Sequence, residues 1–534
     1  MEVKLVSKET SWWMFALPAV FGTQNLLDVH VLISLSVAAV SLYLLTWVLA
    51  GGGGGAWKNG RNRMGRVKIP GPRGLPVFGS LFTLSRGLAH RTLDAFARSR
   101  DETDLMALSL GSTPVVVASE TGTAREILTS VHFADRPVKQ SAKSLMFSRA
   151  IGFAPNGAYW RTLRRIASAH LFAPRRMLAH EAGRKLDCAE MVRAISVEQN
   201  DNGSVVLRKH LQLAALNNVM GSVFGIRYDP PSEKEDLEEL KSMVREGFEL
   251  LGAFNWSDYL PWLVYFYDPF RISQRCSELV PRIRKLVRRI IDEHRVGDSG
   301  KKGDSGDFVD VLLSLDGDEK LEENDMIAVL WEMIFRGTDT TALLTEWAMA
   351  ELVINPNVQA KLRDEINSAV GNGPIADADV AKLPYLQAVV KETLRMHPPG
   401  PLLSWARLST SDVQLSNGMV IPAGTTAMVN MWAITHDPRV WSDPQVFEPE
   451  RFLNGEGADV DVRGGDMRLA PFGAGRRACP GKNMGLATVT RWLAELVRRF
   501  EWAEETSEPV DLAEVLKLSC EMKRPWRAVA VETK

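Results

Sequence analysis

One cysteine of this chain lies in a glycine-rich segment just before a helix-forming run. The segment reads PFGAGRRACPG over residues 471–481 and contains Cys479, and a helical pattern follows from about 484 to 499. Glycines let the backbone approach a sulfur atom and a flat cofactor closely, and a helix start stabilises a thiolate. Arg477 is placed to meet an anionic group of such a cofactor, and Phe472 to shield the sulfur from water. A buried, inert cysteine in a turn is the alternative.

A second set of reactive side chains lies in the middle of a long apolar helix predicted over residues 324–353. The centre of this helix reads FRGTDTT over residues 335–341, and a glycine with three threonines is unusual in a helix interior. Threonine hydroxyls can bond the carbonyl four residues back and open a local bulge that holds a small ligand or water. Asp339 and Thr340 then place an acid beside an alcohol.

Arg336 precedes Thr340 by four residues, so both side chains share one face of this helix. A salt bridge to Glu332, also four residues away and in the favourable order, is the simpler explanation of the arginine. The alternative is that Arg336 presents a cation to a binding pocket and anchors an acidic substrate.

The cysteine segment resembles the signature of cytochromes P-450. That pattern, Phe-x-x-Gly-x-Arg-x-Cys-x-Gly, is met at every fixed position by Phe472, Gly475, Arg477, Cys479 and Gly481. The resemblance covers nearly the whole chain and implies a cytochrome P-450 fold, mainly α with small β-sheets. It also implies a haem b whose iron is bound by the thiolate of Cys479.

The resemblance gives a role to weaker motifs. Glu392 and Arg395 alone form an ordinary i, i+3 pair, but with Arg451 of the FEPERF segment they match the family's buried Glu-Arg-Arg triad. The role of this triad is structural. A buried carboxylate shared by two guanidinium groups is tolerated when it is fully hydrogen-bonded, and the loss of one partner leaves a charge unpaired.

Further matches concern the haem propionates and the oxygen. Trp160 and Arg164 match a Trp-x-x-x-Arg helix that reaches a propionate, and Arg407 is a propionate candidate by position. Asp339 and Thr340 match the family's catalytic acid-alcohol pair, which relays protons to iron-bound oxygen. Where this chain has Arg336, the family has Ala or Gly.

A narrower resemblance is to the plant microsomal subgroup that includes the KLUH and PLASTOCHRON organ-growth regulators. It rests on the segments FADRP (133–137), SLMF (144–147), GFAP (152–155), FRGTDT (335–340) and SWAR (404–407). It implies insertion of one oxygen atom into a lipophilic substrate such as a fatty acid, in a pathway of organ growth and seed size. We expect the substrate pocket to be lined by Leu145, Met146, Phe147, Arg336, Leu402 and Leu403.

No flavin or nucleotide motif is visible in the sequence, so NADPH and flavins would act through a separate NADPH-dependent cytochrome P-450 reductase. Exposed basic residues near the cysteine are candidates for its docking, namely Arg161, Arg165 and Arg176. Two alternatives stay open: a reductase-independent isomerase or dehydratase of lipid hydroperoxides, and a non-catalytic haem sensor. The acid-alcohol pair favours the monooxygenase, because those alternatives need no proton relay to dioxygen.

Composition is that of a large globular protein. Of the 534 residues, 45% are hydrophobic, and 64 basic residues nearly balance 65 acidic ones, which argues against a nucleic-acid partner. The four cysteines are too far apart in sequence for a CxxC-type metal site and suggest a reducing compartment. Helical patterns dominate after residue 78, and strand-like runs such as 113–118 and 418–421 are short.

The amino terminus carries a candidate membrane anchor. Residues 31–50 have no formal charge and, as a helix, span the ~30 Å of a bilayer core. Basic residues are concentrated after this segment, which places the body in the cytosol. We therefore expect a single-pass protein of the endoplasmic reticulum membrane with four parts: a lumenal or interfacial segment (1–30), the anchor (31–50), a glycine-, basic- and proline-rich hinge (51–77) and the haem-binding domain (78–534). A second membrane segment over residues 12–27 is the alternative.

Overall fold

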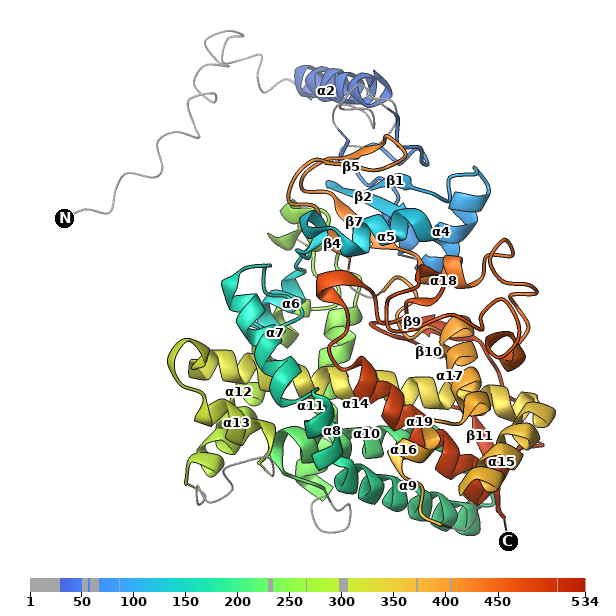
Figure 1. Ribbon diagram of the computed structural model, residues 1–534. Coiled ribbons are helices and arrows are strands. Elements are labelled where there is room, and N and C mark those ends of the chain that lie inside the picture. Colours follow the sequence, from blue (N-terminus) through green and yellow to red (C-terminus); the bar gives the residue numbers. More distant parts are fainter. Residues whose placement is uncertain are drawn as a thin grey trace.

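The computed structural model describes residues 29–49, 56–57, 67–85, 87–228, 234–265, 267–296, 306–370, 373–403, 406–506 and 508–533. Helices dominate these residues and the strands are short, as the sequence predicted (Figure 1). The α-helices are α2 (Val29–Leu49), α3 (Leu81–Leu84), α4 (Ala89–Arg98), α5 (Thr121–Thr129), α6 (Gln140–Leu145), α7 (Ala158–His170), α8 (Pro174–Ala179), α9 (Glu181–Asn202), α10 (Leu207–Phe224), α11 (Lys234–Gly252), α12 (Ile272–Val296), α13 (Phe308–Ser314), α14 (Glu323–Ile354), α15 (Pro356–Val370), α16 (Asp377–Val380), α17 (Pro384–Met396), α18 (Met431–Thr435) and α19 (Lys482–Arg499).

The strands form small separate sheets. They are β1 (Met106–Leu110), β2 (Thr113–Ala118), β3 (Val205–Val206), β4 (Arg407–Leu408), β5 (Val413–Gln414), β6 (Val420–Ile421), β7 (Thr426–Val429), β8 (Phe500–Glu504), β9 (Glu514–Leu516), β10 (Cys520–Met522) and β11 (Arg527–Glu532). The largest has the order β1-β2-β7-β4, and a second has the order β3-β11-β8. In the first, β2 pairs antiparallel with β1, where Val117 faces Met106, and parallel with β7, where Val117 faces Met428. Its valines suit a pleated, buried surface.

Helix α14 crosses the middle of the molecule (Figure 1). Its bounds agree with the predicted 324–353, and nearly all of its side chains outside residues 336–341 are buried, including Trp331 and Trp347. A helix that is apolar on every face must be surrounded by other elements. Helix α14 packs against α10 on one side and α19 on another.

The cysteine segment leads directly into α19. A short 3₁₀ turn covers Gly475–Arg477, Cys479 follows, and α19 begins at Lys482. Gly475 has a φ of +66°, and a Cβ at this position would lie 2.2 Å from the carbonyl oxygen of Leu128. Only glycine therefore allows the segment to pass so close to the end of α5. This contact fixes the position of the cysteine segment relative to α5.

A buried ion-pair cluster holds the polypeptide upstream of the cysteine segment. Glu392 on α17 accepts hydrogen bonds from Arg395 Nε at 2.8 Å and from Arg451 Nε at 3.1 Å. The three side chains are at most 1% exposed. Arg395 also donates to the carbonyl oxygens of Thr435 and Pro444. The predicted Glu-Arg-Arg triad is thus present in the structure, with its charges hydrogen-bonded.

The amino-terminal predictions are covered only in part. The segment predicted as an anchor is helical, as α2, and Tyr43 on α2 donates a hydrogen bond to the carbonyl of Pro76 at 2.6 Å. Among the described residues, no helix reaches the length and hydropathy required to span a membrane. The predicted lumenal segment up to residue 28, the last residue of the predicted anchor (50) and about half of the predicted hinge (51–55 and 58–66) lie outside the described residues.

The triad predicts a specific loss of stability. Replacing Glu392 with Gln removes the fully buried charge that Arg395 and Arg451 share, and we expect the free energy of unfolding to fall by ~3–5 kcal/mol. Urea denaturation followed by circular dichroism measures this change. Glu448→Gln is the matched control: Glu448 pairs with the same Arg451, but its side chain is 52% exposed. Its loss should change the free energy of unfolding by less than ~1 kcal/mol. Equal effects of the two substitutions would contradict the prediction.

Candidate active site

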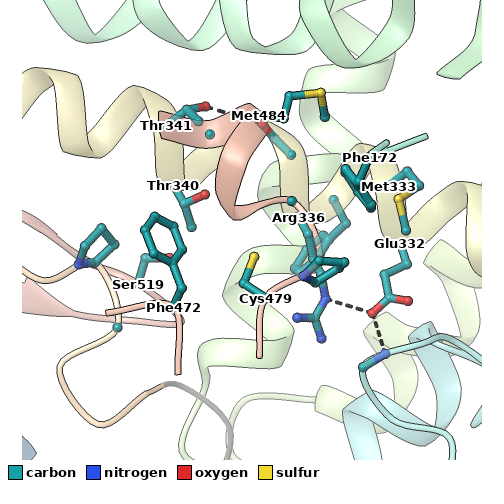
Figure 2. A pocket seen from close by; sticks show the side chains of 18 of the residues that line it. Phe172, Glu332, Met333, Arg336, Thr340, Thr341, Phe472, Cys479, Met484 and Ser519 are labelled. Carbon is teal, nitrogen blue, oxygen red and sulfur yellow. Dashed lines mark hydrogen bonds and ion pairs between the residues drawn. The ribbon is translucent and has the colours of Figure 1, made fainter. Parts of the chain in front are cut away.

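A cavity of about 300 Å³ lies where α14, α10 and the cysteine segment meet. Figure 2 shows this cavity between α14 and the segment that carries Cys479. Apolar side chains form most of its wall, among them Phe248, Met333, Phe335, Leu344 and Met484. The stacked rings of Phe248 and Phe335, 4.1 Å apart, close one side. Such a wall favours a flat, apolar group and a lipophilic molecule beside it.

Cys479 is the cysteine that faces this cavity (Figure 2). Its backbone N–H donates to the carbonyl of Phe472 at 2.9 Å, which closes the loop beneath the sulfur. Burial raises the pKa of the Cys479 thiol, while the N–H of Gly481 and the charge of Arg336 act in the opposite direction. A metal ion that replaces the proton removes this cost, since it neutralises the thiolate directly.

The other cysteines lie away from the cavity wall. Cys188, Cys276 and Cys520 are buried, and burial raises the pKa of each thiol, to about 11 for Cys276. Cys520 donates a hydrogen bond to Glu514 at 3.2 Å. These three are therefore the inert kind of buried cysteine.

Three arginines surround the cavity near the cysteine. Arg477 donates to the carbonyls of Ala134, Ile151 and Ala154 at 2.6–3.0 Å. Arg407 donates to the carbonyl of Ala474 at 3.2 Å, and Arg164 to that of Ala478. In the part of the chain that the structure describes, none of the three arginines forms an ion pair with a carboxylate.

The electrostatics of these arginines indicate an anion site. Burial, together with the charges of neighbouring arginines, lowers the pKa of both Arg407 and Arg477 to about 10. Burial also lowers the pKa of Arg164. Several buried cations close together are stable when a bound anion neutralises their charge. The two propionates of a haem fit this requirement, and the cavity between the arginines and Cys479 fits its apolar face.

Trp160, which the sequence predicts to bind a propionate, is not among the residues that line the cavity. Its indole N–H donates to the carbonyl of Ile151 at 2.9 Å, and its ring lies 4.2 Å beneath the guanidinium of Arg477. The carbonyl of Ile151 is also a partner of Arg477. Trp160 therefore holds Arg477 in place by a cation–π contact.

Thr340 lines the cavity and Asp339 does not. Asp339 faces the hairpin β9–β10 instead, where burial raises its pKa to about 6 and a hydrogen bond from Ser519 opposes that shift. The local bulge predicted from the threonines is absent, because α14 continues through residues 335–341. Gly337 serves a different purpose: a Cβ there would lie 2.4 Å from Val219 on α10. Glycine lets the two helices approach closely.

Arg336 lines the cavity and is also paired. Its Nε lies 2.8 Å from Glu332 Oε1, so the simpler explanation from the sequence is confirmed. The same oxygen accepts a hydrogen bond from the backbone N–H of Gly152 at 2.8 Å (Figure 2). Glu332 thereby ties the loop that carries Gly152 to α14, while its partner Arg336 remains at the cavity wall.

Several predicted pocket residues lie elsewhere. Leu403 lines the cavity, but Leu145 and Met146 are fully buried in the core beneath α6. Phe147 lies 4.6 Å beneath the guanidinium of Arg284, in a separate groove beside α12. Leu402 packs against the cluster around β1 and β2. Sequence motifs identified the segments 145–147 and 402–403 but not the direction in which each of their side chains points.

Part of the cavity wall is formed by residues that no sequence motif predicts. Residues of α10, α11 and the β9–β10 hairpin line the cavity, together with a fourth arginine, namely Asn218, Val219, Ser222, Phe248, Leu518, Ser519 and Arg136. A signal existed for α10, since residues 217–222 read NNVMGS and break an otherwise apolar helix. Nothing local marked the hairpin.

Arg176 also differs from its prediction as an exposed docking residue. It is buried and donates to the carbonyls of His170 and Gly306. Arg161 and Arg165 are exposed on α7, as expected.

Comparisons with known proteins agree with this geometry. The family model described as Cytochrome P450 matches residues 69–523. The chain is 79% identical to cytochrome P450 78A7 of Arabidopsis thaliana over 533 residues, which covers 99% of each chain. It is 62% identical to cytochrome P450 78A11 of Oryza sativa subsp. japonica, with 98% and 96% covered, and 38% identical to a flavonoid 3'-monooxygenase of the same organism, with 88% and 90% covered. The chain therefore belongs to the cytochrome P450 family of haem-thiolate monooxygenases, and within it to the plant 78A subgroup.

Proposed function

We propose that this enzyme inserts one oxygen atom of O2 into a C–H bond of a lipophilic, fatty-acid-like substrate, and that the thiolate of Cys479 would hold the iron of its haem. The observation that carries the proposal is the position of Cys479: its sulfur faces an apolar cavity that buried arginines surround. Haem b held by a thiolate supplies the oxygen-activating chemistry. The remaining steps belong to side chains of the chain itself.

The arginines and the cysteine segment hold the cofactor. Arg164, Arg407 and Arg477 are placed to bind the propionates, since Arg407 and Arg477 are buried, Arg164 is partly buried, and all three donate to backbone carbonyls. The N–H of Gly481 favours the thiolate form of Cys479, because it opposes the rise in pKa that burial causes. Phe472 lies in the cavity wall beside the sulfur and keeps water away from it.

Protons enter from the helix side of the cavity. Thr340 presents its hydroxyl to the cavity, and the half-buried Asp339 beside it has a pKa raised to about 6 by burial. An acid with such a pKa both releases and regains protons near neutral pH. We assign these two residues to proton delivery, with Asp339 as the acid.

The cavity wall defines a substrate with an apolar body and an acidic end. Phe248, Met333 and Leu344 surround an apolar chain, and Arg336 offers a cation within the same wall. A carboxylate that reaches Arg336 would exchange places with Glu332, which keeps its bond to Gly152. Leu403 contributes apolar surface on the opposite side.

Electrons come from an NADPH-dependent reductase, because the sequence offers no flavin or nucleotide motif. Helix α7 lies against the cysteine segment, since Arg164 on α7 donates to the carbonyl of Ala478. Arg161 and Arg165 are exposed on the same helix. Arg165 pairs with Glu319 at 2.8 Å, so Arg161 supplies most of the positive charge on this face. The resemblance to organ-growth regulators supports a role in plant organ and seed size, which measurements of organs in plants that lack this chain would test.

A test of the reaction combines two measurements on wild type, Cys479→Ala and the control Cys520→Ala. Carbon monoxide added to the reduced protein should give a strongly red-shifted Soret band in wild type and in Cys520→Ala, and none in Cys479→Ala. NADPH and reductase should then drive oxygen uptake in wild type and in Cys520→Ala, and not in Cys479→Ala. Absence of the band from folded, haem-loaded wild type would contradict thiolate ligation. A band with hydroperoxide turnover but no oxygen uptake would indicate the isomerase, and neither activity would indicate a sensor.

The role of Arg336 predicts a selective loss of affinity. Arg336→Ala should weaken the binding of a long-chain fatty acid about tenfold to a hundredfold, the range for a hydrogen bond to a charged group. The corresponding fatty alcohol should bind unchanged. Spectral titration of the haem protein measures both affinities, and Arg336→Lys is the control that keeps the charge. An equal loss for acid and alcohol would contradict the assignment.

We place the enzyme in the endoplasmic reticulum membrane, anchored once by α2 with the body in the cytosol. Apolar side chains of α2 such as Leu32, Val37, Val40 and Leu42 are 50–63% exposed, which suits contact with lipid. Removal of residues 1–50 should move the protein from washed membranes to the soluble fraction. An unrelated apolar helix of equal length in place of residues 31–50 should restore membrane binding. Full membrane retention of the truncated chain would contradict a single anchor.

A further inference from the structure

Three side chains of the kinds that bind metal ions meet outside the cavity, where α12 ends and α13 begins. They are His294 of α12 and Asp307 and Asp310 at the start of α13. One ligand atom of each side chain lies within 4.8 Å of the other two. Helix α13 packs against both α12 and α10 (Figure 1). The cluster therefore lies where three helices come together, and none of its members lines the cavity around Cys479.

The ring of His294 has the orientation of a metal ligand. Its Nδ1 lies 2.7 Å from the carbonyl oxygen of Ile290, and because a carbonyl only accepts, Nδ1 carries the proton of this hydrogen bond. Nε2 faces Asp307, with 2.9 Å between Nε2 and Oδ2. Histidines that bind metals usually donate their other ring N–H to a carbonyl or a carboxylate in this way. Ile290 is not part of the cluster, so this orientation is independent of the two carboxylates.

Asp307 and Asp310 are each held through one oxygen. Oδ1 of Asp307 accepts from the backbone N–H of Asp310 at 3.0 Å, and Oδ2 of Asp310 accepts from the N–H of Asp307 at 3.2 Å. The other oxygens, Oδ2 of Asp307 and Oδ1 of Asp310, are left for a further partner. Two ligands of a tetrahedral zinc ion lie about 3.4 Å apart, so shifts of about 1 Å bring the three ligand atoms of the cluster into place.

A glycine at the end of α10 keeps the cluster accessible. Gly225 has a φ of +65°, and a Cβ at this position would lie 2.6 Å from Oδ2 of Asp307. Any other residue would therefore cover the oxygen that faces His294. The side chains of His294 and Asp307 are 15% and 11% exposed, so an ion can enter from solvent and is then surrounded mainly by protein.

The charge of the cluster suits a dication. The hydrogen bond to Asp307 raises the pKa of His294 to about 9, so a metal ion must displace one proton from the ring. Arg176 adds positive charge nearby, and it donates to the carbonyls of His170 and Gly306. A bound dication neutralises both carboxylates. One imidazole with two carboxylates suits Zn²⁺, whereas Mg²⁺ and Ca²⁺ prefer oxygen ligands alone.

We propose that His294, Asp307 and Asp310 bind one Zn²⁺ ion, with water as the fourth ligand. The ion joins the end of α12 to the start of α13 and stabilises the packing of both helices. The site lies outside the cavity, so the proposal does not depend on the proposed function.

Thermal unfolding of the haem-loaded enzyme with and without zinc chloride is the first test. An ion that binds only the folded state stabilises it, so zinc should raise the Tm of wild type, EDTA should reverse the rise, and magnesium chloride should have no effect. His294→Gln removes the ring nitrogen, and Asp310→Asn removes one charge but keeps an oxygen that accepts from the N–H of Asp307. Both variants should lose the zinc-dependent rise. A wild-type Tm that zinc leaves unchanged, or a full rise in Asp310→Asn, would overturn the proposal.

Two control variants exclude zinc bound elsewhere. His210 forms an ion pair with Glu198, so His210→Gln removes a histidine–carboxylate pair that belongs to no cluster of three ligands among the described residues. Cys520→Ala removes one member of the other such cluster, which contains His90, Glu514 and Cys520. Both controls should keep the zinc-dependent rise in Tm. Loss of the rise in either control would contradict the assignment to His294.

X-ray absorption at the zinc edge identifies the ligands directly. Zinc lies ~2.0–2.2 Å from nitrogen and oxygen ligands and ~2.3 Å from sulfur. Wild type with one equivalent of zinc should show histidine nitrogen and oxygen ligands and no sulfur. Competition with a chelator of known affinity measures the Kd, which should rise in His294→Gln by more than the ~10–100-fold that loss of an outer-shell partner costs. Sulfur in the coordination shell, or an equal Kd in His294→Gln and wild type, would overturn the proposal.

Discussion

Burial of positive charge is the constraint on which the rest of this structure depends. Two arginine clusters are removed from water, and each requires a negative charge. In one cluster the chain supplies it: Glu392 neutralises Arg395 and Arg451. In the other, around Arg477, the described residues supply carbonyl oxygens and no paired carboxylate. The second cluster is therefore completed by a bound anion, and the fold reaches its full stability with the cofactor in place.

Helix α14 satisfies two demands that conflict. As the central helix it must be buried by its neighbours, and Gly337 allows α10 to approach it closely. As one wall of the site it must also present polar side chains, and Thr340 and Arg336 face the cavity. Asp339 faces a different neighbour, so its environment is set by the hairpin β9–β10. Burial raises the pKa of Asp339, and groups of this hairpin add smaller contributions of both signs.

The sequence predicted those features that depend on local chemistry. The helical body, the extent of α14, strand β2, the position of Cys479 and the Glu-Arg-Arg triad were all readable from motif and periodicity. Features that depend on partners distant in sequence could not be predicted in this way. Trp160 was predicted to bind the cofactor, but its indole donates a hydrogen bond to the carbonyl of Ile151 and stacks on the guanidinium of Arg477. Spacing along one helix shows which side chains share a face. The element that packs against that face depends on the tertiary structure. Ser519 had no local signal for the same reason.

Arg336 illustrates why two interpretations of one residue need not exclude each other. The ion pair with Glu332 explains how a cation is tolerated in an apolar wall, since the pair leaves no net charge there. The same pair also sets the cost of acid binding. A substrate carboxylate that displaced Glu332 from Arg336 would leave the buried Glu332 with the backbone N–H of Gly152 as its donor. Separation of such a pair costs ~3–5 kcal/mol, so only an acid whose own contacts in the cavity exceed that cost would bind there. An internal ion pair therefore suits a site that must be stable when empty and selective for acids when filled.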